Sequence, residues 1–298
     1  MMNRRVAAAL ATLALVAASC GTTTGGGPAV AATGNTGTSE AAPAATVTSE
    51  PTTTLGETAA ETTTTTAIAD QRRLDVTLEP PPWEEVTIET ADGIELFGRF
   101  WEGGDVAVIV GHDFDNPTPG SAGQRPPQSS ENALPYTAAI VREGFTVLAF
   151  DWRGHGSSGG QFDIRSSPTD LEAVYSWVAG NGFEKVFMVG WQGAGTSAVV
   201  ADAASPDIEF DGIALLFSPP QDIGLNADAV LGEIDGLTLF IGTNGRRTGS
   251  WAKRMEAKAT NSFGVFNFEP TPTGLQFIDV FGGELAGRVV DLVETATA

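Results

Sequence analysis

From about residue 83 onward, the apolar and polar positions of the chain alternate between strand patterns and helix patterns. Residues 84–90 and 94–101 alternate apolar and polar side chains around Asp92-Gly93, which predicts a β-hairpin with one half-exposed face. The later apolar runs are nearly continuous, as expected of strands that are buried on both faces. These predicted strands are residues 106–111, 145–151, 185–190, 212–218, 237–242 and 264–270.

Helices are predicted between these strands, at residues 133–142, 167–178, 196–204, 250–259 and 284–293. The helix at Ser167 has Pro168 and Asp170 in its first turn, where both residue types are favoured. Repeated strand–helix units predict an α/β fold, with a mostly parallel sheet of about eight strands and helices on both faces. Residues 219–236 leave room for only a short excursion, so no large lid is expected.

Four ordered blocks carry a family resemblance. They read VIVGHDFD (108–115), GFTVLAFDWRGHGSSGG (144–160), VFMVGWQGAG (186–195) and LTLFIGTNGRR (237–247). In this order the chain resembles the α/β-hydrolase superfamily, close to its small lidless esterases and dienelactone-hydrolase-like members. The resemblance covers residues from about 84 to the end, and the second block is the most specific. It implies an α/β-hydrolase fold with its nucleophile elbow at the third block.

The catalytic positions of that superfamily carry other residues in this chain. Gln192 stands at the nucleophile position, and an amide cannot form an acyl-enzyme. The acid position falls at Asn244 or Gly245 and the histidine position falls at Thr273. No histidine follows His155 in the sequence, so the general base is missing from its expected region. Asp222 is an alternative acid after strand six, but without a histidine it has nothing to orient.

The oxyanion hole of this fold uses two backbone N–H groups, one after the nucleophile and one after strand three. The resemblance places them at Gly193 and Phe114. Asp113 and Asp115 flank Phe114, and carboxylates beside a developing oxyanion oppose its stabilisation. The sequence therefore predicts a hydrolase scaffold with a degenerate triad.

The two residues at the elbow each have two interpretations. Gln192 is a hydrogen-bonding group at the mouth of a pocket, since its amide offers two donors and an acceptor, or a residue that drifted after catalysis was lost. Trp191 either packs in the core, which we favour, or forms an aromatic wall for a ligand.

The histidines and their acidic neighbours are candidates for other chemistry. His112 with Asp113 and Asp115 suggests a metal or acid/base cluster, whereas turn and capping chemistry is the favoured interpretation. His155 is interpreted as a structural loop residue that shapes the site wall. No metal or other cofactor is expected.

The remaining polar candidates are given structural roles. The resemblance implies that Asp151 and Arg153 form a pair that braces the loop at the end of the fourth strand, and a ligand contact is secondary. The hydroxyl groups near the elbow are interpreted as helix or turn hydroxyls rather than as relocated nucleophiles. They belong to Thr196, Ser197 and Ser218.

The amino-terminal residues predict export. Residues 1–19 combine Arg4 and Arg5 with an apolar run that is too short to span a bilayer, as in a secretory signal peptide. Cys20, the only cysteine, follows directly in AASC, which resembles a bacterial lipobox. We favour a lipid-modified Cys20 that holds the chain on the outer face of a membrane. The alternative is an ordinary cleaved signal with an incidental cysteine.

Residues 20–71 contain no aromatic residue, lysine or arginine and are rich in Thr, Ala and Gly. Such a segment buries too little apolar surface to fold, so a disordered tether is expected. Its threonine clusters are either O-glycosylated or a bare spacer. The net charge of −21 disfavours binding to nucleic acid and to anionic membranes. The folded domain is expected at residues 83–298.

Three hypotheses about function follow. The favoured one is a lipid-anchored, catalytically degenerate hydrolase-fold protein that binds a small molecule or an envelope protein. The second is an active hydrolase with rearranged machinery, using His112 or His155 with Asp113, Asp115 or Asp151, or a hydroxyl such as Ser197. The third is a structural lipoprotein without a functional pocket.

Overall fold

The computed structural model describes residues 72–114, 129–270 and 274–298, with the side chains of 274–276 excepted. Residues 68–298 form one compact unit, and all described residues lie in it. The predicted signal peptide, Cys20, the tether, Asp115 and Thr273 lie outside the described residues.

The core of the unit is an eight-stranded sheet in the order β1-β2-β4-β3-β5-β6-β9-β10. β1 and β2 form the predicted antiparallel hairpin, and β2 pairs antiparallel with β4. The other strand pairs are parallel, so the predicted mostly parallel sheet is confirmed. Its strands are β1 (Glu84–Glu89), β2 (Glu95–Trp101), β3 (Val106–Gly111), β4 (Thr146–Phe150), β5 (Lys185–Trp191), β6 (Gly212–Leu216), β9 (Leu237–Thr243) and β10 (Ser262–Phe268).

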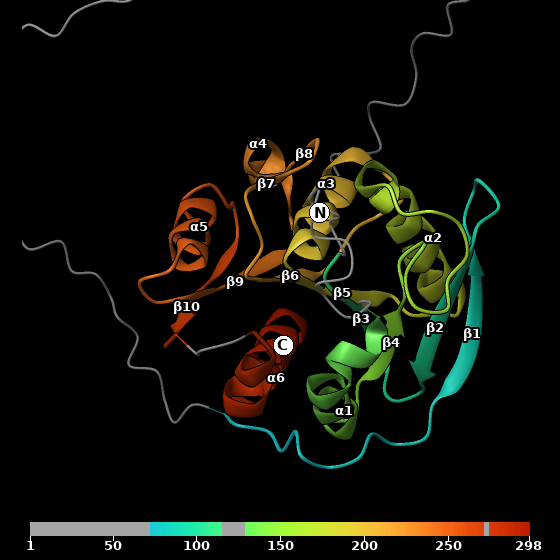
Figure 1. Ribbon diagram of the computed structural model, residues 1–298, viewed down its shortest axis with the longest axis horizontal. Coiled ribbons are helices and arrows are strands. Elements are labelled where there is room, and N and C mark those ends of the chain that lie inside the picture. The colour runs from blue at the N-terminus through green and yellow to red at the C-terminus, as the bar shows by residue number, and fades with distance from the viewer. Residues whose placement is uncertain (1–71, 115–128, 271–273) are drawn as a thin grey trace, which may run out of the picture. The chain divides into compact units, whose positions relative to one another are not determined.

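Helices cover both faces of this sheet (Figure 1). α1 (Leu134–Arg142) and α6 (Gly274–Thr297) lie on one face, and α2 (Ser167–Gly180), α3 (Gly193–Ala204) and α5 (Arg247–Glu256) lie on the other. Each face buries its own apolar cluster. The excursion between β6 and β9 holds only short elements, as predicted: β7 (Gln221–Asp222), β8 (Leu225–Asn226), α4 (Ala227–Val230) and a 3-10 turn (Leu231–Glu233).

Two helices begin earlier than the sequence pattern predicts. α3 begins at Gly193, directly after the elbow, and α6 begins ten residues before the predicted position. α6 tolerates Gly283 because the extended start of the unit packs there: Leu74 N–H donates to Gly283 O, and a Cβ on Gly283 would collide with Leu74 O. Although α6 has 24 residues, neither it nor any other helix in the described ranges is apolar enough over sufficient length to cross a membrane.

Candidate functional site

The turn from β5 into α3 holds Gln192 in a conformation that L-residues rarely adopt, with φ 47° and ψ −117°. Two hydrogen bonds maintain it. Gln192 N–H donates to Leu216 O at 2.7 Å, and Gln192 O accepts from Gly195 N–H at 3.1 Å. This is the strand, sharp turn and helix arrangement that the sequence predicts around Gln192.

Close backbone packing explains the glycines on either side of the turn. A Cβ on Gly190 would lie 2.5 Å from Gly195 Cα, and a Cβ on Gly195 would collide with the Ser218 hydroxyl. β5 and α3 therefore approach each other more closely than any side chain permits, and this closeness forces the turn at Gln192.

We expect Gln192→Gly to raise the free energy of unfolding by about 1 kcal/mol. Glycine adopts φ 47° without the strain of about 1–3 kcal/mol that other residues carry, while its greater freedom in the unfolded chain offsets part of the gain. Urea unfolding measures the difference. Gln161→Gly, in an exposed loop, is the matched control and should lower stability. A loss of stability in Gln192→Gly would show that the contacts of the Gln192 side chain contribute more to stability than the backbone strain costs.

The expected oxyanion donor after β3 is already bound. Phe114 N–H donates to Asp113 Oδ1 at 2.8 Å. The Phe114 ring is buried and packs on the backbone of the second expected donor, since a Cβ on Gly193 would lie 2.8 Å from Phe114 Cε2. The ring also contacts Trp152 and Phe162, each with a centroid distance of 4.9 Å. An aromatic side chain thus lies beside Gly193, at the start of α3.

A carboxylate lies beside the same glycine. Asp222 Oδ2 would be 2.9 Å from a Cβ on Gly193, although Asp222 belongs to the short excursion after β6. Burial raises the pKa of Asp222, and a hydrogen bond from the Ile223 backbone opposes this shift. With Asp113, the site therefore carries two carboxylates where a hydrolase needs donors of positive potential.

Both ring nitrogens of His112 hold backbone in place. Nδ1 lies 2.6 Å from Asp113 O, so it donates, and Nε2 accepts from Trp152 N–H at 3.4 Å. Trp152 Nε1 in turn donates to His112 O at 3.0 Å. His112 is buried, at 2% exposure. His112 therefore fastens the loop after β3 to the loop after β4.

Asp151 and His155 lie close to His112 but serve the loop after β4. Asp151 Oδ1 is 4.0 Å from His112 Nε2, yet it accepts from Ser130 N–H at 2.7 Å, and Oδ2 accepts from Ser157 N–H at 2.9 Å. The His155 ring is 5.4 Å from the His112 ring, and Nδ1 lies 3.1 Å from Arg153 O. The structure thus brings together His112, Asp151 and His155 of the rearranged-hydrolase hypothesis, all buried and bound to backbone groups.

Arg153 also braces the loop after β4, but its acidic partners are Asp170 and Asp92 rather than Asp151. Its Nε donates to Asp170 Oδ1 at 2.7 Å on α2, and its Nη1 donates to Asp92 Oδ2 at 2.7 Å in the hairpin turn. Asp170 is buried, and burial raises its pKa against the opposing effect of Arg153. Asp151 and Arg153 therefore act separately rather than as one pair.

The Asp92→Asn variant should lose less free energy of unfolding than the wild type as the pH falls. Hydrogen bonds from Arg153, and then from the Thr90 hydroxyl, lower the pKa of Asp92 from 3.8 to about 2. Because the folded-state pKa lies below the unfolded one, this contribution is present above about pH 4 and is lost as the pH falls towards 2. The measurement is urea unfolding at pH 7, 4 and 2. A stability difference from wild type that stays constant over that range would contradict the assignment.

The three hydroxyls near the elbow all have structural partners. Thr196 Oγ1 donates to Pro219 O at 2.6 Å, and Ser197 Oγ donates to Ser167 Oγ at 2.7 Å. Ser218 Oγ lies 3.5 Å from Gly190 O, behind the elbow. All three residues are buried, and the contacts of Thr196 and Ser197 connect α3 to its neighbours.

Trp191 belongs to an aromatic cluster on the opposite face from α3. Its ring stacks on Tyr136 at 6.3 Å and contacts Phe217 at 5.1 Å and Phe277 at 6.0 Å. Phe217 is the other non-glycine residue with positive φ in the described ranges, at 56°. Two strained residues thus lie at the ends of neighbouring strands β5 and β6.

The predicted acid position lies at the end of β9. Asn244 Nδ2 donates to Glu269 Oε1 at 2.8 Å, so an acid is present beside it, but on the segment after β10. Gly245 has φ 65° and forms the turn before α5. The histidine position, Thr273, lies outside the described residues.

Two features of the site could not be predicted from the sequence pattern. Asp222 is identifiable as an acid after strand six, but its position against Gly193 depends on the path of the excursion. The positive φ of Phe217 has no sequence signal, because bulky residues avoid that region.

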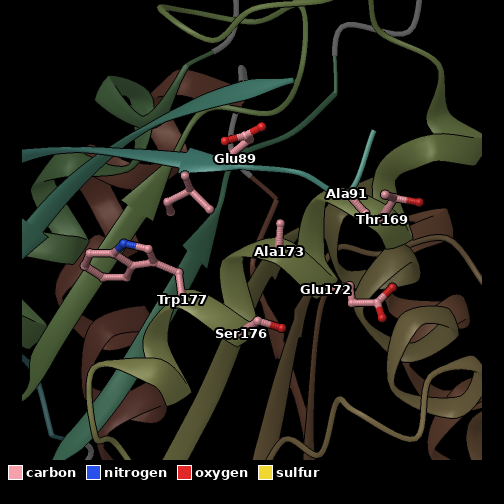
Figure 2. A pocket seen from close by; sticks show the side chains of 8 residues that line it. Glu89, Ala91, Thr169, Glu172, Ala173, Ser176 and Trp177 are labelled. Atoms are coloured by element: carbon pink, nitrogen blue, oxygen red, sulfur yellow. The ribbon is translucent and has the colours of Figure 1, made fainter. Parts of the chain in front are cut away.

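A separate groove of about 410 Å³ lies between the end of β1 and α2 (Figure 2). It is lined by Ile88, Glu89, Ala91, Thr169, Glu172, Ala173, Ser176 and Trp177. None of these residues belongs to the elbow. Within the described ranges, no group of three or more His, Cys, Asp or Glu side chains is placed to hold a metal ion.

The sheet order and the turn at Gln192 are those of an α/β-hydrolase fold, and solved structures agree. The esterase Pf2001 of Pyrococcus furiosus matches with a TM-score of 0.57 at 18% identity, over 73% of this chain and 99% of that one. The esterase EaEST of Exiguobacterium antarcticum matches with a TM-score of 0.57 at 11% identity, over 71% of this chain and 100% of that one. At these identities the likeness shows the fold.

The sequence comparison identifies a family that is narrower than the fold class. The family model described as X-Pro dipeptidyl-peptidase (S15 family) matches residues 53–210, more than half of the 298 residues. The chain therefore belongs to the X-Pro dipeptidyl-peptidase (S15) family. Two uncharacterized proteins of Mycobacterium tuberculosis, Rv2307c and MT2364, are each 27% identical over 125 residues, which is 41% of this chain. The match spans 40% of the length of each of these relatives.

Proposed function

We propose that this protein is a catalytically inactive member of its family, exported and lipid-anchored through Cys20, whose elbow region binds a ligand or an envelope partner. The observation that carries the proposal is the 2.8 Å hydrogen bond from Phe114 N–H to Asp113 Oδ1. It occupies one of the two donors on which acyl transfer in this fold depends. A substrate oxyanion would have to displace a carboxylate to reach that donor.

Three further features support inactivity. The elbow carries an amide instead of a nucleophile, the sequence has no histidine after His155, and both nitrogens of His112 are bound to backbone groups. A general base must reach the proton that it removes, and the printed partners of both histidines are backbone groups of the loops after β3 and β4. X-Pro dipeptide cleavage is the activity in the family's name. By acyl transfer in this fold, it needs a nucleophile, a general base and an oxyanion hole.

Retained strain supports a binding role. Gln192 and Phe217 keep left-handed backbone conformations that cost roughly 1–3 kcal/mol each. Asp113 and Asp222 make the region beside Gly193 electronegative, which favours a neutral or cationic ligand over an anionic one. The elbow would then be a shaped, acidic binding surface.

The second candidate is an active ester or acyl hydrolase with rearranged catalytic residues. Family membership favours it, as does Asp222, a half-buried acid whose raised pKa suits proton transfer beside the elbow. In this account Asp222, rather than Gln192, would carry chemistry.

Turnover of p-nitrophenyl acetate and of an Xaa-Pro-p-nitroanilide by the full-length chain separates the two candidates. We expect rates equal to those of a heat-denatured control. Turnover that is lost in Asp222→Asn, or in His112→Ala and His155→Ala, but kept in Asp207→Asn, would establish the second candidate and refute the first. Unfolding of each variant is measured alongside, so that a misfolded variant is not mistaken for an inactive one.

A further inference from the structure

The two edges of the sheet differ in charge. β1, at one edge, has Glu84, Glu85 and Glu89, all exposed. Charges on an edge strand prevent its unpaired N–H and C=O groups from joining another strand. β10, at the other edge, reads SFGVFNF and has no charged residue in seven positions. β10 is therefore the edge that lacks this protection.

The side chains of β10 are incompletely covered. Five of its seven residues are half-buried, whereas the neighbouring β9 is buried over five of its seven. Phe263 and Phe266 are among these half-buried residues, with ring centroids 6.3 Å apart. Among the described residues no strand pairs with the outer side of β10. An additional strand there would complete both the hydrogen bonding and the apolar burial.

On each face of the sheet at this end, a helix carries an arginine that stacks on an aromatic ring. On one face, Arg247 of α5 lies 4.8 Å from the Trp251 ring, and α5 packs on β9 and β10. On the other face, Arg288 of α6 lies 4.0 Å from the Phe266 ring of β10 itself. α5 and α6 flank the sheet from opposite sides at this end (Figure 1).

Among the described residues, Arg247 has no ion pair, and Arg288 has a single long one, with Asp291 at 3.9 Å. The Arg288 side chain is 8% exposed, and an arginine so enclosed normally has close acceptors. The acids at the two ends of β10 are engaged elsewhere, since Glu256 accepts from Ser262 and Glu269 accepts from Asn244. This end of the sheet therefore combines an open backbone edge with two arginines, in a chain of net charge −21.

We infer that β10 is a docking edge for an extended acidic peptide segment of a partner protein, which pairs with β10 and directs carboxylates to Arg247 and Arg288. Successive side chains of a strand point to opposite faces. The partner strand therefore needs acids an odd number of residues apart, one for each face. This surface lies apart from the elbow, so the inference stands whether or not the elbow is inactive.

Fluorescence anisotropy with labelled synthetic peptides and the full-length chain tests this inference. The probe peptide is Thr-Val-Glu-Thr-Val-Glu-Val-Thr, with its acids on opposite faces. One control, Thr-Val-Glu-Thr-Glu-Val-Val-Thr, has both acids on one face, and a second has lysines in place of glutamates. We expect the probe to bind more tightly than either control, and its affinity to fall with salt.

Arg247→Glu, at an exposed position that leaves the core intact, should weaken binding of the probe by at least roughly fivefold. Arg165→Glu, an exposed arginine near the start of α2, should leave it unchanged. Equal binding of the lysine peptide, or an unchanged affinity in Arg247→Glu, would overturn the inference. Self-association of the full-length chain that disappears in Phe263→Lys would assign the edge to a second copy and would also overturn it.

Discussion

Replacing Arg153 by methionine should lower the free energy of unfolding by about 3–5 kcal/mol. The substitution leaves Asp170 buried, with 0% side-chain exposure, and removes the guanidinium that donates to it at 2.7 Å. A buried carboxylate without a partner either remains charged at high cost or takes up a proton. Urea unfolding at pH 7 measures the loss.

Two further variants separate the buried pair from general effects. Arg165→Met removes an exposed arginine that pairs with Asp163, and it should change stability by less than about 0.5 kcal/mol. The double variant Arg153→Met with Asp170→Leu removes both charges and should recover most of the loss. A double variant as unstable as Arg153→Met would mean that Arg153 acts mainly through Asp92 or through packing.

Gly190→Ala should destabilise the protein by about 3 kcal/mol or more, because backbone atoms cannot move aside as a side chain can. The new methyl group would lie 2.5 Å from Gly195 Cα and would push α3 away from β5. Gly180→Ala, at the end of α2 with no atom within 4 Å, is the matched control and should be neutral or stabilising by about 0.5–1 kcal/mol. Thermal unfolding compares the two. A fully folded Gly190→Ala protein would show that the elbow is less tightly packed than its geometry indicates.

Most of the sheet could be predicted from the sequence because its buried strands are short, continuous apolar runs. The hairpin at Asp92-Gly93 and the turn at Gln192 have local signals, namely a turn dipeptide and closely spaced glycines. The early start of α6 could not be predicted, because Gly282 and Gly283 have low helix propensity and pack against residues 73–76, some two hundred positions earlier. Such tertiary packing has no signature within the helix itself.

Part of the candidate site could also be predicted from the sequence. The family resemblance of the four sequence blocks placed Gln192 and Gly193 at the elbow and Phe114 in the oxyanion loop. The hydrogen bond between Phe114 N–H and Asp113 depends on loop conformation, and the position of Asp222 depends on an excursion with weak sequence pattern. The stacking of Arg288 on Phe266 joins two elements that only the folded sheet brings together.

We propose above all that the elbow has no nucleophile and no usable oxyanion hole. Labelling of the full-length chain with a fluorophosphonate probe, followed by peptide mass mapping, tests it most directly. The Gln192→Ser variant is treated in the same way, and a known serine hydrolase shows that the probe is active. The account predicts no labelled residue in the wild-type chain and little or none at position 192 in the variant, since the base and one oxyanion donor are still lacking. Stoichiometric labelling of a wild-type serine would contradict the account and would place an active nucleophile elsewhere in the chain.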